Sequence, residues 1–554
     1  MTHSLKTALA LTAAFVLSPL LTACGGGGGS SASVSPPPLA TTPPTPLPTV
    51  SSAPTVPDFV ANEFPPSSEL ESLCEIVRTD TDLNGNSRPD QQGELLHELF
   101  WLRSWMNETY LFFDQVMDRD PNDFSDVEAY FDELLVAPPT DRFSFLQTTE
   151  DFETRTSGAP TFGYGAEFAR LSNQLPRDWR VSFTQSGSPA EAGGLTRGAR
   201  ILTIDGVDFL NGNTPTDIDA INAGLFPTTV GEAHVFGLRY PDGSESDITI
   251  ESTSLAIEPV NVVDIIAQGS RNVGYLHFNS FGTTTGQAQL IEAFETFSTA
   301  QIDDLVLDLR YNGGGFVDLA AQLGYMIAGT QSINQVFIST EFNSRNPSRN
   351  PFTGQTVSPT LFQPTTLRFA PEDPPGGEPL PTVNLNRVFV LTTGRSCSAS
   401  EAIINGLIGI GVEAIQIGTR TCGKATGQFP TENCGFTFVP LHFRGVNAMG
   451  FGDFDEGFVP GQMTGSAGPV IMGCVVNDDL DNALGDPNEA QLASALNFAE
   501  TGTCSSDATA TAKTDITLNK FMISGEDDKL LEHPRIKAID LEFGRLDFST
   551  RRVE

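Results

Sequence analysis

The sequence is poor in basic residues, with 31 Lys and Arg against 69 Asp and Glu, which gives a net charge of −38. Nucleic acids and anionic membranes attract proteins through basic patches, so this balance argues against both as partners. Zinc motifs are missing too, because the chain holds no Cys-x-x-Cys pair and no Cys/His cluster. The composition therefore points away from nucleic-acid binding and from a zinc site.

The N-terminus also lacks an apolar run long enough to span a bilayer comfortably, because Thr7–Leu21 is too short. A short basic segment precedes this run, and Leu21-Thr22-Ala23-Cys24 follows it and resembles the bacterial lipobox. We therefore predict a lipoprotein signal peptide over residues 1–23 and lipidation of Cys24. An ordinary signal peptide with an incidental cysteine is the alternative.

The segment after the lipobox holds no charged residue between Gly25 and Pro57. Such a composition cannot bury a core, so residues 24–62 are predicted to be a Gly/Pro/Ser-rich tether. Anchor and tether together predict an exported lipoprotein on the periplasmic or cell-surface side of a bacterial outer membrane.

Export predicts that the cysteines form disulfides, because disulfides persist in oxidising compartments. Short loop closure favours Cys422 with Cys434 and Cys474 with Cys504. The even set that remains without Cys24 is Cys74, Cys397, Cys422, Cys434, Cys474 and Cys504.

Residues 63–158 are predicted to form a helical N-terminal domain, because apolar residues recur at three- and four-residue steps through "ELLHELFWLRSWMNETYLFFDQVM". Just upstream, "DTDLNGNSRPD" resembles the start of a calcium loop, although Gln91 stands where a bidentate Glu is expected. A solvated turn is the alternative to a structural Ca²⁺ site. The candidate ligands are Asp80, Asp82, Asn84 and Asp90.

Residues 159–256 carry β-strand and turn signals, among them the hairpin dipeptide Asp205-Gly206. The stretch "SGSPAEAGGLTRGARILTIDGVDF" resembles a PDZ domain, a family in which a glycine-containing loop binds a peptide's terminal carboxylate. A β-domain of purely structural use is the alternative. The residues at the place of the PDZ carboxylate loop are Gly163, Tyr164, Gly165 and Ala166.

Strands and helices alternate over 257–504, which predicts an α/β domain. The predicted strands include 272–281, 303–315 and 387–393. The fold class is thus a multidomain α/β protein with a helical N-terminal segment, a β-rich PDZ domain and an α/β catalytic domain. Residues 505–554 form a charged C-terminal tail that we do not assign.

Catalytic bases are scarce in the last domain. His277 and His442 each lie in an apolar, strand-like run, where a histidine is more often a packed core residue than a base. A lysine can serve instead if burial lowers its pKa from about 10.4 to about 7, at a cost of roughly 4–5 kcal/mol. Lys424 has only uncharged neighbours from Thr421 to Gly427, which suits this role.

A candidate nucleophile lies in "TTGRSCSASEAIINGL", where a strand-like run meets a helix-like one. Ser398 and Glu401 satisfy the capping-box spacing, so Ser398 could simply cap the helix. A nucleophile at a helix N-terminus would equally gain backbone N–H groups for an oxyanion. Local sequence does not separate the two roles.

Several motifs together resemble the C-terminal processing (tail-specific) peptidases, a family of serine–lysine proteases with a PDZ domain. Its S-A-S-A-S-E motif appears at 396–401, with Cys397 in place of an alanine, and its G-x-x-T-x-G-K motif appears at 418–424. The strand end D-L-R-x-N-x-G-G begins at Asp308 and includes Asn312, Gly313 and Gly314, and the segments follow the family's order.

The resemblance implies a nucleophile at Ser398, a base at Lys424 and a glutamine at Gln428 that orients the lysine. It also implies an oxyanion hole formed by the N–H groups of Ala399 and of Gly314 or Gly313. No cofactor is required by such a mechanism. The partners would be protein or peptide substrates, together with the membrane that holds the lipid anchor.

The sequence thus predicts a serine endopeptidase that acts on exported or cell-envelope proteins and recognises their C-termini. A non-catalytic PDZ-containing scaffold and a hydrolase of another acyl bond are the alternatives.

Overall fold

The computed structural model describes residues 55–505 except 83–84, 157–160, 173–174, 257, 370–373 and 466–467. The predicted signal peptide, Cys24, the tether up to residue 54, Asn84 and the tail from residue 506 lie outside these residues. Among the helices described, none is both long and apolar enough to cross a membrane.

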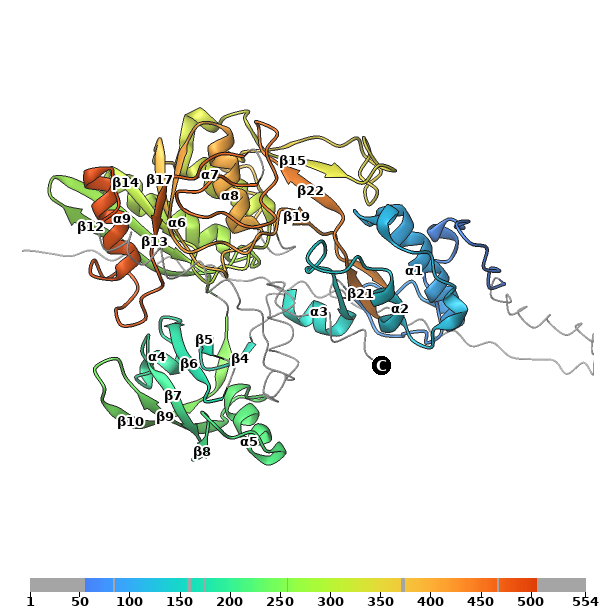
Figure 1. Cartoon of the computed structure of the whole chain (residues 1–554), viewed down its shortest axis with the longest axis horizontal. Coiled ribbons are helices and arrows are strands. Elements are labelled where there is room, and N and C mark those ends of the chain that lie inside the picture. Colours follow the sequence, from blue (N-terminus) through green and yellow to red (C-terminus); the bar gives the residue numbers. More distant parts are fainter. Residues whose placement is uncertain are drawn as a thin grey trace, which may run out of the picture. The chain divides into compact units, whose positions relative to one another are not determined.

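A six-stranded, mostly parallel sheet forms the centre of the 258–505 region (Figure 1). Its strand order is β12-β13-β14-β17-β18-β23, and only the β12–β13 pair is antiparallel. The strands are β12 Val260–Gln268, β13 Arg271–Phe278, β14 Asp304–Asp308, β17 Arg387–Thr392, β18 Glu413–Gly418 and β23 Gly473–Val475.

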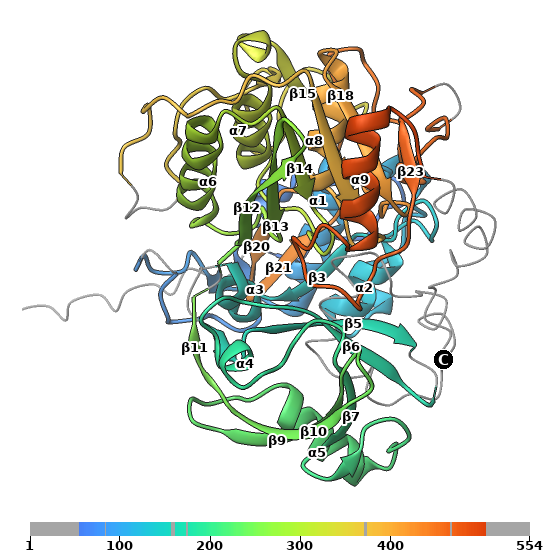
Figure 2. The same cartoon turned by 90° about the vertical axis from the view of Figure 1, so that its left-hand side faces the viewer.

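Helices cover both faces of this sheet, because its strands are apolar on both sides. Alternate residues of β14 and β17 enter two separate cores: Leu307 and Val390 pack with α6, α7 and α8, whereas Val306 and Phe389 pack with α9. Figure 2 shows α9 in front of the sheet and α6 and α7 to its side. The helices are α6 Gly286–Ala300, α7 Val317–Ala328, α8 Ala399–Gly409 and α9 Ala490–Thr501.

The N-terminal segment contains less helix than its periodicity predicts. The main helix α1 ends at Thr109 because Tyr110 adopts an extended backbone conformation. Short helices and strands complete the segment: η1 Ser67–Glu69, β1 Leu73–Cys74, β2 Gln91–Gln92, α1 Leu95–Thr109, η2 Phe113–Gln115, η3 Pro121–Asp123, α2 Val127–Glu133, β3 Phe145–Thr148 and α3 Thr149–Thr156.

Strand β3 joins the N-terminal segment to the 258–505 region, because it pairs with β21 in a three-stranded sheet. Trp101 and Trp105 of α1 pack on Phe438 of β21, which buries this junction. The remaining small elements of the 258–505 region are β15 Val336–Phe342, β16 Thr360–Leu361, β19 Thr426–Gly427, β20 Thr431–Asn433, β21 Phe436–Val439, β22 Phe443–Val446 and η4 Gly329–Ser332.

The β-rich segment has its own sheet, with the path β10-β9-β7-β6-β5, and its own core. Strand β5 is an edge of this sheet, and α5 packs its apolar face on the core. The elements are β4 Thr161–Gly163, β5 Ala166–Ser172, β6 Asp178–Thr184, α4 Pro189–Ala192, β7 Arg200–Ile204, β8 Val207–Asp208, α5 Pro215–Leu225, β9 Ala233–Arg239, β10 Glu245–Glu251 and β11 Thr253–Leu255.

Candidate active site

The three serines of the 396–400 segment have different surroundings. Ser396 Oγ donates to the Leu309 carbonyl and Ser400 Oγ donates to the Asn312 carbonyl, both at 2.9 Å. Both side chains are buried and hold the turn after β14. Ser398 is only half-buried and lies at the entrance to α8. Two of the serines are therefore structural, and Ser398 is the one placed for chemistry.

Ser398 has a backbone φ of +54°, a region that residues other than glycine rarely adopt. Such a conformation costs about 1–3 kcal/mol and persists only where neighbouring contacts hold it. Here the Ser398 N–H donates to Glu401 Oε2 at 3.0 Å, and the Glu401 N–H donates to the Ser398 carbonyl at 2.9 Å. The residue is thus held by its own helix start.

Glu401 connects the nucleophile to the turn that carries the lysine. Its Oε1 accepts from the Thr421 hydroxyl at 2.6 Å and from the Gly423 N–H at 2.8 Å. Its Oε2 accepts from the Lys424 N–H at 2.8 Å as well as from the Ser398 N–H. Burial raises the pKa of this carboxyl, and these hydrogen bonds oppose that shift. One side chain therefore spans both halves of the predicted dyad.

Lys424 is joined to Gln428 as the resemblance predicted, with Nζ donating to Gln428 Oε1 at 2.9 Å. The amide can only face this way, because Gln428 Nε2 donates to the Phe143 carbonyl at 2.7 Å and to the Val439 carbonyl at 3.0 Å. The Phe143 ring centroid lies 5.3 Å from Nζ. An uncharged acceptor and an aromatic face thus line the amine.

Lys424 is the only lysine between Lys6 and Lys513, and so the only one among the described residues. Every other basic side chain in that range, histidine apart, is an arginine, which keeps its proton in proteins. A lysine is therefore present only where the predicted mechanism needs an amine that can lose a proton.

The glycine turn after β14 lies against the nucleophile. A Cβ atom at Gly314 would come within 2.7 Å of Ser398 Cβ and 2.9 Å of the Ala399 nitrogen, so only glycine fits there. The Gly314 N–H itself donates to Asn312 Oδ1 at 2.9 Å. Among the described residues, the N–H groups of Gly313 and Ala399 have no acceptor. Of the two predicted glycine donors, Gly313 is the one left open.

The disulfides correct one predicted pairing and confirm the other. Cys474 is bonded to Cys504, as predicted. Cys422 is bonded to Cys397, not to Cys434, and Cys434 is bonded to Cys74. The short-loop argument was wrong here because β1 lies beside the β20–β21 hairpin, where the Ser72 N–H donates to Asn433 Oδ1 at 2.8 Å. The pairing follows which cysteines lie close together in the folded protein, not which pair closes the shorter loop.

The two histidines are core residues, as their surroundings predicted. His277 is fully buried against Phe183 and Tyr311, and burial lowers its pKa to about 4. His442 packs on Trp105 and accepts from the Phe429 N–H at 3.0 Å, and burial lowers its pKa to about 3. In the described contacts neither ring touches Ser398.

The predicted peptide-binding loop borders the edge strand β5. Gly165 has a φ of +77°, and a Cβ there would lie 2.4 Å from Ser188 Cβ. Tyr164 is a core residue whose hydroxyl donates to the Gly224 carbonyl at 2.8 Å, while Gly163 ends β4 and Ala166 begins β5. Only the backbone of this loop is therefore placed for a ligand.

The three candidate calcium ligands that the structure describes, Asp80, Asp82 and Asp90, do not form one cluster. Asp90 is held by Arg78 at 2.7 Å, and Asp80 lies 3.2 Å from the Arg88 guanidinium. Asp82 Oδ1 accepts from the Asn86 N–H at 2.8 Å. The side chains of Cys397, Glu401 and Cys422 lie close enough together to hold a metal ion, but the two sulfur atoms form a disulfide with each other. These contacts do not fit a calcium cage, so the cation stays a sequence-based prediction.

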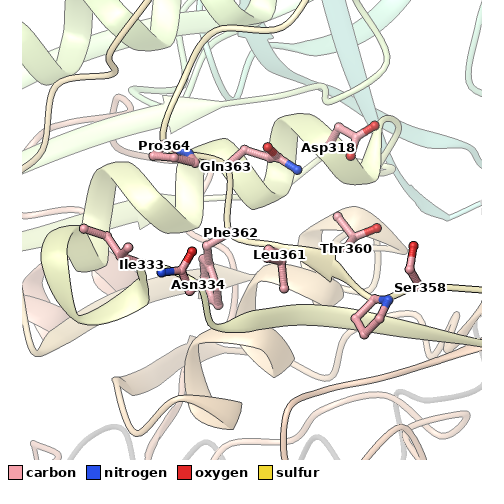
Figure 3. Close-up of a pocket in the computed structure, with 10 residues that line it drawn as sticks. Asp318, Ile333, Asn334, Ser358, Thr360, Leu361, Phe362, Gln363 and Pro364 are labelled. Atoms are coloured by element: carbon pink, nitrogen blue, oxygen red, sulfur yellow. The ribbon is translucent and has the colours of Figure 1, made fainter. Parts of the chain in front are cut away.

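A pocket of about 350 Å³ lies elsewhere, between the start of α7 and the β16 segment (Figure 3). Figure 3 shows Asp318 at one side and Ile333 and Asn334 at another. None of its lining residues belongs to the predicted active site.

The comparisons with known proteins agree with this geometry. Residues 272–437 match peptidase family S41, and residues 100–145 match the peptidase S41 N-terminal domain. The chain is 28% identical over 159 residues to a carboxyl-terminal-processing protease of Picosynechococcus sp. and 24% identical over 266 residues to a chloroplastic C-terminal processing peptidase of Tetradesmus obliquus. These matches cover 26% and 44% of this chain, and 34% and 54% of the relatives.

A crystal structure of a Bacteroides fragilis protein assigned to the S41 proteases shares the fold, with a TM-score of 0.56 and 24% identity. It covers 73% of this chain and 97% of that one. Two segments of the chain thus match the models of peptidase family S41 and of its N-terminal domain, which confirms the resemblance to C-terminal processing peptidases.

Proposed function

We propose that this chain is a serine endopeptidase with a Ser398–Lys424 dyad. The observation that carries the proposal is the Glu401 bridge, which ties the sole lysine of the described region to the start of the nucleophile helix. Gln428 supports the lysine with a neutral acceptor, whereas a carboxylate at that place would favour the charged ammonium.

In this mechanism Ser398 Oγ attacks the scissile carbonyl carbon while Lys424 Nζ takes the hydroxyl proton. The N–H groups of Ala399 and Gly313 hold the oxyanion, and Gly314 lets the glycine turn approach the serine. The lysine then gives its proton to the leaving amine. Water attacks the acyl-serine ester with the same amine as base, which frees Ser398.

The substrates in this proposal are exported or cell-envelope proteins whose C-termini bind the β-rich segment as they would a PDZ domain. Support comes from the edge position of β5 and from the loop at Gly165 beside it, whose φ of +77° suits glycine. Arg395 pairs with Glu167 of β5 at 2.5 Å, so this strand contacts the segment that leads into Ser398. The predicted lipobox at Cys24 would hold the enzyme at the outer membrane.

Three variants test the dyad against a fluorogenic peptide substrate. We expect Ser398→Ala and Lys424→Arg to abolish turnover, because Arg keeps the charge but cannot act as a base. The exposed Ser298→Ala on α6 is the matched control and should leave activity unchanged. Full activity in either dyad variant refutes the mechanism. Failure of a fluorophosphonate probe to label Ser398 would favour a non-catalytic scaffold.

Substrate recognition is tested separately with the Ser398→Ala chain. Calorimetry with one peptide, carrying a free or an amidated C-terminus, should show binding only of the free carboxylate. Equal affinity for the two forms would contradict a PDZ-type role.

A further inference from the structure

The Cys397–Cys422 disulfide lies between the two halves of the proposed dyad. Cys397 directly precedes Ser398, and Cys422 lies two residues before Lys424. Their Cα atoms are 5.2 Å apart, and both residues are buried. The Cys422 N–H also donates to the Ser396 carbonyl at 3.1 Å, so the two backbone segments cross at this point.

The same cysteine lies next to the oxyanion turn, because the Cys397 N–H donates to the Asn312 carbonyl at 3.0 Å. Cys397 thus contacts the glycine turn through its backbone and the lysine turn through its sulfur. Ser398, immediately after it, keeps a φ of +54° that depends on fixed neighbours. Loosening Cys397 would therefore disturb the nucleophile, the base and the oxyanion donors together.

The other two disulfides lack this placement. Cys74–Cys434 joins β1 to the β20–β21 turn, and Cys474–Cys504 joins β23 to the segment after α9. The latter pair therefore offers a matched control for the loss of a disulfide, with a loop of similar separation, 30 residues against 25.

We propose that Cys397 and Cys422 are positioning residues whose disulfide completes the peptidase site, so that the oxidised enzyme is active and the reduced enzyme has little activity. This inference rests on the proposed Ser398–Lys424 dyad. Disulfides form in exported proteins and rarely persist in the cytosol, so the chain would acquire activity only after export. The Glu401 hydrogen bonds to Thr421, Gly423 and Lys424 do not involve the disulfide, so we expect the reduced protein to remain folded.

The first test compares the Cys397→Ala/Cys422→Ala double variant with Cys474→Ala/Cys504→Ala. A misplacement of about 1 Å costs on the order of 100-fold in rate, so we expect kcat of the first pair to fall by about 10- to 100-fold with KM nearly unchanged. Fluorophosphonate labelling of Ser398 should slow in parallel. The control pair should lose thermal stability but keep its kcat. Wild-type kcat in the first pair, or an equal loss in both, overturns the proposal.

A second test needs no substitution and covers the case in which the double variant fails to fold. A water-soluble phosphine supplies two electrons to the S–S bond and becomes a phosphine oxide, while water supplies its oxygen and the two thiol protons. Activity should fall as mass spectrometry detects free thiols at Cys397 and Cys422, and should return on reoxidation. Undiminished activity with both thiols free refutes the inference.

These outcomes are distinct from failure of the proposed function. If Ser398→Ala stays active, the dyad itself is wrong. If Ser398→Ala is inactive while the reduced enzyme keeps full kcat, only the role of the disulfide is wrong.

Discussion

Glu401→Gln is the most informative single change in the active site. The substitution keeps the size of the side chain and removes one oxygen atom and one charge. In the native protein the two carboxylate oxygens accept from four donors, two on each oxygen: the Ser398 and Lys424 N–H groups and the Thr421 and Gly423 donors. An amide NH₂ group cannot accept, so either orientation of the glutamine loses two of the four hydrogen bonds.

The size of the effect follows from this count. A hydrogen bond to a charged group contributes about 1.5–3 kcal/mol, so two of them amount to about 3–6 kcal/mol at the junction of the dyad. The two donors that lose their acceptor oxygen then face the N–H groups of the new amide, which repel them. We expect the lysine turn to move away from Ser398 and kcat to fall at least about 100-fold.

Steady-state peptide hydrolysis, the rate of fluorophosphonate labelling and a thermal melt together measure this loss. Glu295→Gln on the exposed face of α6 is the control for the loss of one charge and should behave as wild type. A folded Glu401→Gln enzyme with native kcat would refute the view that this carboxylate holds the dyad.

Two further predictions concern the base and the N-terminal helix. Replacing Gln428 by Ala removes the acceptor 2.9 Å from Lys424 Nζ, and we expect kcat to fall about 10-fold at unchanged KM in steady-state kinetics; an unchanged kcat would contradict the orienting role. Burial raises the pKa of Glu98 from 4.5 to about 7, so its folded form binds the proton more tightly and native stability falls as pH rises from 4.5 to 7. Glu98→Gln should remove about 3 kcal/mol of that decline in urea titrations at pH 4.5 and pH 8, whereas an identical pH slope in both proteins would contradict it.

The central sheet could be predicted from the sequence because its strands are buried on both faces. The predicted strands at 272–281, 303–315 and 387–393 correspond to β13, β14 and β17, although β14 ends at Asp308 where the glycine turn begins. Continuous apolar runs mark such strands. Elements of two or three residues, such as β1 and β19, are too short to show a period, and the sequence analysis did not find them.

Only the candidate site residues that lie in recognisable motifs could be predicted from the sequence. Ser398, Lys424 and Gln428 lie in motifs that can be matched residue by residue. The capping-box spacing identified Glu401 as a partner of Ser398 but gave no sign that its carboxylate also binds Thr421, Gly423 and Lys424, since those contacts span 20 residues or more. The predicted Cys422–Cys434 pairing was wrong for the same reason, because the true partners depend on which strands meet.

The N-terminal segment belongs to the active site physically, not only by order along the chain. The Arg142 guanidinium donates to the Cys422 carbonyl at 2.5 Å. The Phe143 carbonyl accepts from the Gln428 amide, and the Phe143 ring lies near the Lys424 amine. Asp141 holds this loop by accepting from the Phe143 and Ser144 N–H groups. Without residues 141–148 the Gln428 amide would lose one of its two carbonyl acceptors, and β21 would lose one of its two partner strands. The 258–505 region therefore needs the N-terminal segment to hold Gln428, the residue that orients the proposed base Lys424.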